Sequence, residues 1–123
     1  MVTPKGNSIV RSRWAPTPSG FLHVGNAFNF LITWLITRQQ NGILRLRIDD
    51  LDQARCRQEY LEDIFLTLDW LGVDWDEGPF GVEEHVEKFS QSLRIPAYEE
   101  FLSTLKTKGK LFACTCSRKE IMA

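Results

Sequence analysis

The segment IVRSRWAPTPSGFLHVGNAFNFLITWLITRQQNGILRLRI, residues 9–48, changes its hydrophobic period twice. Residues 9–14 alternate between apolar and polar side chains as a β-strand does, and residues 43–48 repeat that alternation. Between them lies a run with helical spacing, which begins near residue 26 and stops at Gly42. Its expected buried face consists of Ala27, Leu31, Trp34 and Leu35. The order strand, helix, strand predicts a parallel α/β sheet with a right-handed crossover.

Two more helices are expected farther along the chain. The first ends at Gly72, and its apolar face is formed by Leu61, Ile64, Phe65, Leu68 and Leu71. The second ends near Gly109, and its apolar face is formed by Tyr98, Phe101, Leu102 and Leu105. Between these helices, residues 73–79 are compatible with a strand or a loop, and residues 80–91 are expected to be irregular.

The last residues of the chain predict a strand and the start of a helix. Residues 111–116 have the pattern of a third strand. Ser117 and Glu120 then have the spacing of a capping box, which predicts that a further helix begins there. Only three residues, 121–123, follow this capping box, which favours an unfinished domain over a frayed one-turn tail.

Composition indicates an ordinary globular protein of one domain at most. The chain has 123 residues, of which 43% are hydrophobic, and a net charge of −1, which excludes a polycation that binds nucleic acid over its whole surface. The odd count of three cysteines suits a reducing compartment. The longest apolar stretch, residues 28–36, is too short to span a membrane, and no signal-peptide core precedes it. We therefore expect a cytoplasmic protein without membrane contact, whose residues 1–8 form a leader. The sequence leaves the oligomeric state open, and a monomer is the simplest expectation.

Two loops that follow the predicted strands carry side chains suited to substrate binding. Ligands of parallel sheets bind at the carboxyl ends of strands, where the loop 15–20 and the acidic residues 49–52 are both expected. His23 and Gly25 stand at a helix N-terminus, which attracts phosphate through free N–H groups and the helix dipole. Taken alone, however, His23 is better explained as a turn histidine, and residues 49–52, Asp52 above all, as a loop that caps the next helix.

Four blocks of sequence resemble, in order, the signatures of glutamate-specific class I aminoacyl-tRNA synthetases. Residues 13–26, RWAPTPSGFLHVGN, are similar to the first signature, and residues 46–52, LRIDDLD, together with Arg55, to the second. Residues 70–79, WLGVDWDEGP, are similar to the third. The fourth and shortest block consists of Gln91, Ser92, Arg94 and Tyr98. The resemblance implies a Rossmann-like sheet and makes residues 9–123 the N-terminal part of the class I catalytic domain.

The resemblance also implies a reaction and a set of site residues. The reaction is the activation of glutamate by ATP, with Mg²⁺, to glutamyl-adenylate, followed by transfer to the acceptor end of a tRNA. Glutamate binding is implied for Arg13, Ala15, Pro16, Thr17 and Asp49. The guanidinium of Arg13 would hold the side-chain carboxylate as a fork, and the carboxylate of Asp49 would hold the ammonium group. ATP binding is implied for Pro18, His23, Gly25 and Asn26, of which the last three are the implied catalytic residues.

Some residues depart from the family pattern, and they bear on the choice of amino acid. Asp49 stands where the family usually has Glu, and Leu51 where Thr is common. Residues 28–30, Phe-Asn-Phe, stand where glutamyl enzymes often have Arg and small residues. The run 114–118, Cys-Thr-Cys-Ser-Arg, resembles the zinc-site opening of glutamyl-queuosine tRNA(Asp) synthetases, whereas the run 76–79, Asp-Glu-Gly-Pro, favours an ordinary glutamyl-tRNA ligase. The acceptor tRNA therefore stays open.

Cys114 and Cys116 are, on this resemblance, half of a possible zinc site. The simpler interpretation is that they are two cysteines on one face of a strand. Cys56 is expected to be incidental and His85 to be solvated. The tryptophans are expected to pack in the core rather than to stack on bases; they are Trp14, Trp34, Trp70 and Trp75.

The second class I signature, a Lys-rich loop, is not among the 123 residues, so the chain alone is expected to be inactive. Two other functions remain possible on the sequence. One is a non-catalytic half-domain that binds a nucleotide or a partner protein. The other is a class I nucleotidyltransferase that acts outside translation.

Overall fold

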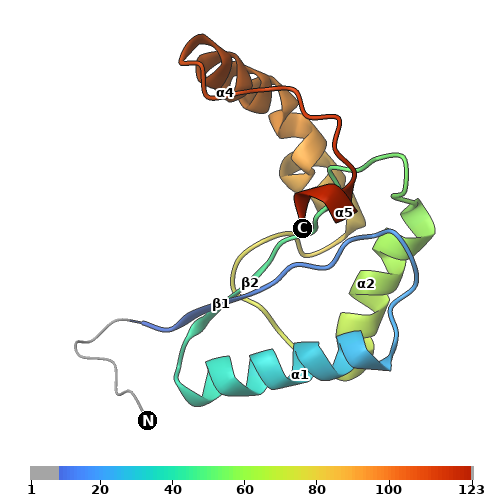
Figure 1. Ribbon diagram of the computed structural model, residues 1–123. Helices are drawn as coiled ribbons and strands as arrows, with labels where there is room; N and C mark the ends of the chain where they lie inside the picture. The colour runs from blue at the N-terminus through green and yellow to red at the C-terminus, as the bar shows by residue number, and fades with distance from the viewer. Residues whose placement is uncertain (1–8, 123) are drawn as a thin grey trace. The chain divides into compact units, whose positions relative to one another are not determined.

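The computed structural model describes residues 9–122, which fold as a mixed α/β chain (Figure 1). The elements are, in order, β1 (Arg11–Trp14), α1 (Val24–Gln39), β2 (Ile43–Leu46), α2 (Gln58–Leu71), α3 (Val82–Glu84), the π-helical turn η1 (His85–Phe89), the 3₁₀ turn η2 (Gln91–Arg94), α4 (Ile95–Thr107) and α5 (Arg118–Ile121). They form two compact units that divide between Leu93 and Arg94. The predicted leader, residues 1–8, lies outside the described residues.

β1 and β2 form the predicted parallel pair, with Arg13 opposite Arg45 and Trp14 opposite Leu46. Both strands are shorter than the alternating segments predicted them to be. Main-chain hydrogen bonds nevertheless continue past their ends, since the Asp49 N–H donates to the carbonyl of Pro16 over 2.9 Å. The pairing therefore carries the two loops that follow the strands side by side.

The core of the first unit lies between the sheet and the helices α1 and α2. Because successive side chains of a strand point to opposite faces of the sheet, Trp14, Leu44 and Leu46 lie on the face that the helices cover, and all three are buried. The arginines Arg11, Arg13 and Arg45 alternate with them and are exposed on the opposite face. Contributions from the helices and loops complete the buried cluster: Phe30, Ile48, Leu61, Ile64, Leu68 and Val73.

The helix boundaries follow from local chemistry. α2 ends where Gly72 adopts a left-handed conformation with φ of 66°, as its position in the sequence predicts. Its predicted apolar face is confirmed. The face predicted for α1 is wrong at Leu35, which is 52% exposed, because the helix turns Phe30 and Thr37 toward the sheet instead.

Residues 73–79 form a loop that ion pairs hold to the first unit. Arg38 at the end of α1 bonds both Asp74 and Asp76, and the Asp76 carboxylate also accepts the main-chain N–H of Leu44 over 2.7 Å. Glu77 bonds Arg45 and makes one isolated parallel bridge beside β2. The acidic run at 74–77 therefore serves the fold.

The prediction of an irregular segment at 80–91 is wrong. Residues 82–89 form α3 and η1, and η2 begins at Gln91. Val82, Val86 and Phe89 have helical spacing, but charged neighbours made this segment resemble a solvated loop. The helix is fixed by the Glu84 carboxylate, which accepts the Phe80 N–H over 2.9 Å, and by the buried side chain of His85.

The second unit, described to residue 122, contains α4 and α5. The apolar residues predicted for one face of α4 are all exposed: Tyr98, Phe101, Leu102 and Leu105. The prediction of a strand at 111–116 is wrong, because a short apolar run becomes a strand only when it has a partner, and no described strand pairs with this segment. The capping box at α5 is confirmed, since Ser117 Oγ accepts the Glu120 N–H and Glu120 Oε2 accepts the Ser117 N–H.

No helix within residues 9–122 combines the length and the apolar character that crossing a bilayer requires.

Candidate active site

His23 is the N-cap of α1, and its two ring nitrogens have different surroundings. Nδ1 accepts the N–H of Gly25 over 3.1 Å, while the side chain of Asn26 accepts the main-chain N–H of His23. This arrangement is a capping box with a histidine in the place of the usual serine. Because Nδ1 accepts, the proton of the neutral ring is on Nε2, which has no hydrogen-bond partner among residues 9–122. His23 is exposed, so this N–H is available to a ligand at the helix N-terminus.

Gly25 is required for this cap because of a close approach. A Cβ atom on Gly25 would lie 2.9 Å from Cε1 of His23 and 3.0 Å from Nδ1. The imidazole would have to move, and its bond to the Gly25 N–H would break. His23, Gly25 and Asn26 thus form one local unit, as expected for a motif in which each residue positions the next.

The β1–α1 loop and the β2–α2 loop meet at the carboxyl edge of the sheet. Pro16 accepts the N–H of Asp49, and the carbonyl of Pro18 accepts the N–H of Arg57 over 3.2 Å. Pro16 and Pro18 are buried, whereas Ala15 and Thr17 between them are exposed. The loop is therefore anchored through its prolines and presents Ala15 and Thr17 to solvent.

Asp49 is fixed by an arginine and an amide. Its carboxylate accepts two bonds from Arg47, of 2.6 and 2.8 Å, and Oδ1 also accepts Nε2 of Gln91 over 2.9 Å. About one third of the side chain is exposed. A carboxylate offers about four lone pairs, and these bonds leave capacity on Oδ2 for a further donor.

Arg13 lies in a shallow groove on the uncovered face of the sheet. The groove has a volume of about 470 Å³ and is lined by Arg11, Ser12, Arg13, Ile43, Arg45 and Glu77. Arg11 and Arg45 both pair with Glu77. The guanidinium of Arg13 has no hydrogen-bond or ion-pair partner within residues 9–122 and is exposed. Arg13 is therefore the cation of this groove that can accept an anionic ligand without first breaking an ion pair.

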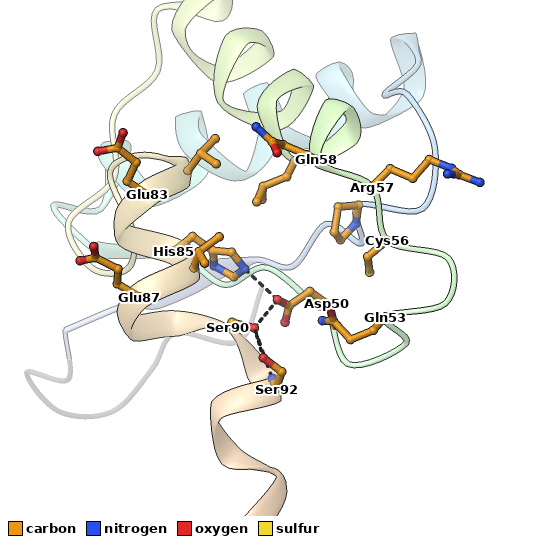
Figure 2. A pocket seen from close by; sticks show the side chains of 14 residues that line it. Asp50, Gln53, Cys56, Arg57, Gln58, Glu83, His85, Glu87, Ser90 and Ser92 are labelled. Atoms are coloured by element: carbon orange, nitrogen blue, oxygen red, sulfur yellow. Dashed lines mark hydrogen bonds and ion pairs between the residues drawn. The ribbon is translucent and has the colours of Figure 1, made fainter.

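Asp50 is the centre of a buried polar network that the sequence did not predict (Figure 2). Its carboxylate accepts Nε2 of His85 over 3.0 Å, Oγ of Ser90 over 2.6 Å and the main-chain N–H of Gln91 over 2.7 Å. Burial alone would raise the pKa of Asp50, but the bonds from Ser90, Gln91 and His85 outweigh it and hold that pKa below its ordinary value.

His85 was expected to be solvated, and this expectation is wrong. Its side chain is 1% exposed, and Nδ1 is buried without a partner among the described residues. The acidic run 49–52 does not cap α2 either, because the N-cap is Arg57 and Asp52 pairs with Arg55 instead. Sequence reasoning missed His85 because its partner Asp50 is distant along the chain.

A cavity with a volume of about 500 Å³ lies beside this network. Of the residues predicted to form the active site, only Pro18 lines it, while Arg13 lines the separate groove. His23, Gly25 and Asn26 line neither cavity. Main-chain hydrogen bonds between the loops after β1 and β2 bring some of the predicted active-site residues together at the carboxyl edge of the sheet. The described residues do not enclose all of the predicted active-site residues in one pocket.

The comparison with protein families decides which fold this is. Residues 9–123 match the family described as tRNA synthetases class I (E and Q), catalytic domain. The chain belongs to this family. A glutamate–tRNA ligase of Geobacter sulfurreducens is 46% identical over 116 residues, and a glutamyl-Q tRNA(Asp) synthetase of Nitratidesulfovibrio vulgaris is 43% identical over 113. These alignments cover 94% and 92% of this chain.

Solved structures agree with the class I assignment. A glutamate–tRNA synthetase of Elizabethkingia anophelis matches 81% of this chain with a TM-score of 0.66 and 29% identity. The synthetase of Elizabethkingia meningosepticum, solved with its amino acid, matches with a TM-score of 0.64. The two-stranded parallel sheet is thus part of the Rossmann-like catalytic domain of a class I synthetase. This chain spans 23% and 35% of the two curated relatives and 20% of the Elizabethkingia anophelis chain.

Of the groups that a class I synthetase uses, ATP suits the described residues better than zinc does. The α1 N-terminus offers a phosphate the Nε2–H of His23, whose ring lies against the Cα of Gly25. Cys114 and Cys116 are exposed, and the Cys116 N–H holds the pKa of the Cys114 thiol below its ordinary value. No group of three or more metal-binding side chains occurs within residues 9–122, so the described residues do not complete a zinc site.

Proposed function

We propose that the complete protein containing these residues activates glutamate with ATP and transfers it to a tRNA. The observation that carries the choice of amino acid is the unpartnered Arg13 guanidinium at the end of β1. A guanidinium matches a carboxylate through two parallel hydrogen bonds, and glutamate has a second carboxylate to offer. The names of the relatives, glutamate–tRNA ligase and glutamyl-Q tRNA(Asp) synthetase, support the same substrate.

Amino-acid activation needs positioning more than it needs a base. The α-carboxylate oxygen of glutamate forms a bond to the α-phosphorus of ATP, the bond from that phosphorus to the bridging oxygen breaks, and pyrophosphate leaves. The attacking group is already an anion, so no proton has to be removed. Mg²⁺ accompanies ATP and offsets phosphate charge.

The residues of this chain take three roles in the step. Arg13 holds the side-chain carboxylate, and Asp49 holds the ammonium group through its remaining capacity on Oδ2. Thr17, with Ala15 and Pro16, borders the amino acid along the β1–α1 loop. Pro18, Gly25 and Asn26 shape the phosphate site, and the Nε2–H of His23 donates to a phosphate oxygen as charge develops there.

The acceptor tRNA is the open part of the proposal, because relatives of both names match this chain at similar identity. Transfer of radiolabelled glutamate to tRNA(Glu) and to queuosine-modified tRNA(Asp), assayed side by side, distinguishes the two. Three free cysteines among the described residues suit a cytoplasmic location. A non-catalytic half-domain, the second candidate, would transfer glutamate to neither tRNA.

Replacement of Arg13 tests the choice of glutamate. In the complete protein, Arg13→Ala should raise the KM for glutamate by roughly 100-fold, as expected when a bidentate charged contact is lost, while the KM for ATP stays within about twofold. Arg11→Ala is the matched control, since Arg11 lies on the same strand and face but pairs with Glu77. Equal effects of the two variants on the KM for glutamate would contradict the role of Arg13.

A further inference from the structure

The buried network around Asp50 has no part in the proposed reaction, although it lies directly beside Asp49. Its members come from three places in the chain: Asp50 follows β2, His85 begins η1, and Ser90 lies between η1 and Gln91, the first residue of η2. A buried carboxylate without partners is costly, but this one has three donors on its two oxygens. Ser90 donates to Asp50, so Ser92, 2.7 Å away, donates in turn to Ser90.

Gln91 connects this network to the predicted ammonium-binding residue. Its main-chain N–H donates to Oδ1 of Asp50, and its side-chain Nε2 donates to Oδ1 of Asp49. Gln91 therefore donates a hydrogen bond to each of the carboxylates of Asp49 and Asp50, which are consecutive residues in the loop after β2. The side chain of Gln91 reaches Asp49 only if its main chain is correctly placed, and Asp50 fixes that main chain.

We propose that His85 is a positioning residue for amino-acid binding, which acts through Asp50 and Gln91 to orient the Asp49 carboxylate toward the substrate ammonium group. The inference rests on the proposed function. His85 does not touch the substrate. It contacts Oδ2 of Asp50 (Figure 2). Asp50 in turn holds the main chain of Gln91, whose side-chain amide donates to Asp49.

The short side chain of Asp49 makes this positioning consequential. Where the resembled family usually has Glu, this chain has one methylene less, so the carboxylate has less reach. Arg47 holds it by a pair of bonds from a residue only two positions away in the same loop. The third bond, from Gln91, ties the carboxylate to a second segment of the chain, and Oδ2, which Gln91 does not touch, keeps capacity for the substrate.

Kinetics of the complete protein test the proposal. His85→Ala should raise the KM for glutamate by roughly 10-fold, the effect of losing one hydrogen bond to a charged group, with the KM for ATP unchanged. His85→Gln places an amide donor near the position of Nε2 and should restore the KM to within about threefold of the wild type. The matched control is Cys56→Ser, because Cys56 lines the cavity beside Asp50 and His85 but is not part of their hydrogen-bond network. This control should change neither the KM for glutamate nor the KM for ATP.

A double-mutant cycle separates positioning from a merely structural role. If His85 acts through Gln91, the double variant His85→Ala/Gln91→Leu should have the KM for glutamate of Gln91→Leu alone. The inference would be overturned if the two single substitutions raised the KM for glutamate by factors that multiply in the double variant. It would also be overturned if His85→Ala left the KM for glutamate unchanged. Either outcome would leave the proposed function intact. If His85→Ala fails to fold, Ser90→Ala, which removes another donor to Asp50, takes its place with the same expectation. A wild-type protein that does not activate glutamate would overturn both proposals.

Discussion

At the scale of single residues, His23 uses one ring nitrogen for the helix and leaves the other for a ligand. Nδ1 accepts the Gly25 N–H, and this bond decides the tautomer of the neutral ring. A histidine that only occupied a turn would have no such fixed tautomer. The capping role and the proposed phosphate contact therefore depend on each other, since loss of the cap would also misdirect Nε2.

Substitution of Gly25 tests this dependence. In Gly25→Ala the new Cβ displaces the imidazole, so His23 should populate both neutral tautomers. Long-range proton–nitrogen NMR spectra measure this, because a protonated and an unprotonated ring nitrogen have widely separated shifts. Gly20→Ala is the control, since a Cβ there meets nothing within 4 Å. A Gly25→Ala protein in which His23 keeps only the Nε2–H tautomer would contradict the account of the cap.

Residue-level reasoning from the sequence succeeded where the decisive neighbours are close along the chain. The capping box at Ser117 and the helix end at Gly72 each depend on partners within a few residues. It failed for His85 and for Trp70, which was expected to pack in the core but is 80% exposed. The partner of His85 is 35 residues away, and no local pattern contains that contact.

At the scale of elements, the sheet edge is held by loops that approach it closely. Gly78 has φ of 115°, a region that favours glycine, and a Cβ there would collide with the carbonyl of Leu46 in β2. The loop 73–79 thus lies against β2 only because residue 78 has no side chain. The arginine Arg38 then fixes the other end of this loop through Asp74 and Asp76.

Gly78→Ala should therefore destabilise the first unit by roughly 2 kcal/mol or more, because it combines a strained backbone with a steric clash. Urea unfolding followed by tryptophan fluorescence measures the loss. Gly20→Ala serves as the control here too and should stay within about 0.5 kcal/mol of the wild type. Equal stability of Gly78→Ala and the wild type would mean that the loop does not need this approach.

The segment 85–92 depends on pH through Asp50. Because the folded protein holds the pKa of this carboxyl below its ordinary value, the ionised group adds stability above the unfolded pKa of about 3.9. This contribution is lost as the pH falls through the lower, folded pKa. Asp50→Asn should lower the free energy of unfolding by about 2 kcal/mol at pH 7. Below about pH 4, the free energy of unfolding of this variant should fall less steeply with pH than that of the wild type.

Unfolding free energies measured from pH 2 to pH 7 check this expectation. Asp69→Asn is the matched control, since Asp69 is an exposed residue of α2 whose side chain has no partner among the described residues. Its curve should follow that of the wild type. Parallel curves for Asp50→Asn and the wild type would show that Asp50 does not carry the acid dependence.

Periodicity predicted the elements of the first unit better than those of the second. The strands and the helices α1 and α2 bury one face against each other, so their hydrophobic period reflects real contacts. Residues 111–116 are a short apolar run typical of a strand too, but a strand needs a partner, and composition does not supply one. The same holds for the candidate site. The order of the strands predicted that its two loops lie together, but the network that fixes Asp49 joins residues distant along the chain and could be found only in the tertiary structure.

At the scale of the whole molecule, the chain carries the first class I signature but not the second. Cys114 and Cys116 are free and exposed, and the described residues place no third metal-binding side chain with them, whereas a structural zinc site needs four ligands. The 123-residue chain should therefore bind zinc weakly and lose it to a mild chelator. Metal analysis after dialysis measures this. One zinc retained per chain would mean that Cys56, His85 or a second copy completes the site.

The central claim is that the protein containing residues 1–123 activates glutamate at the edge where the loops after β1 and β2 meet. Glutamate-dependent exchange of pyrophosphate into ATP, measured for the complete protein with unfractionated tRNA present, tests it most directly. Exchange should require glutamate among the twenty amino acids, should fall by roughly 100-fold in kcat for His23→Ala, as when one transition-state donor is removed, and should be undetectable for the 123-residue chain alone. Exchange that prefers another amino acid, or that is unchanged in His23→Ala, would contradict the account.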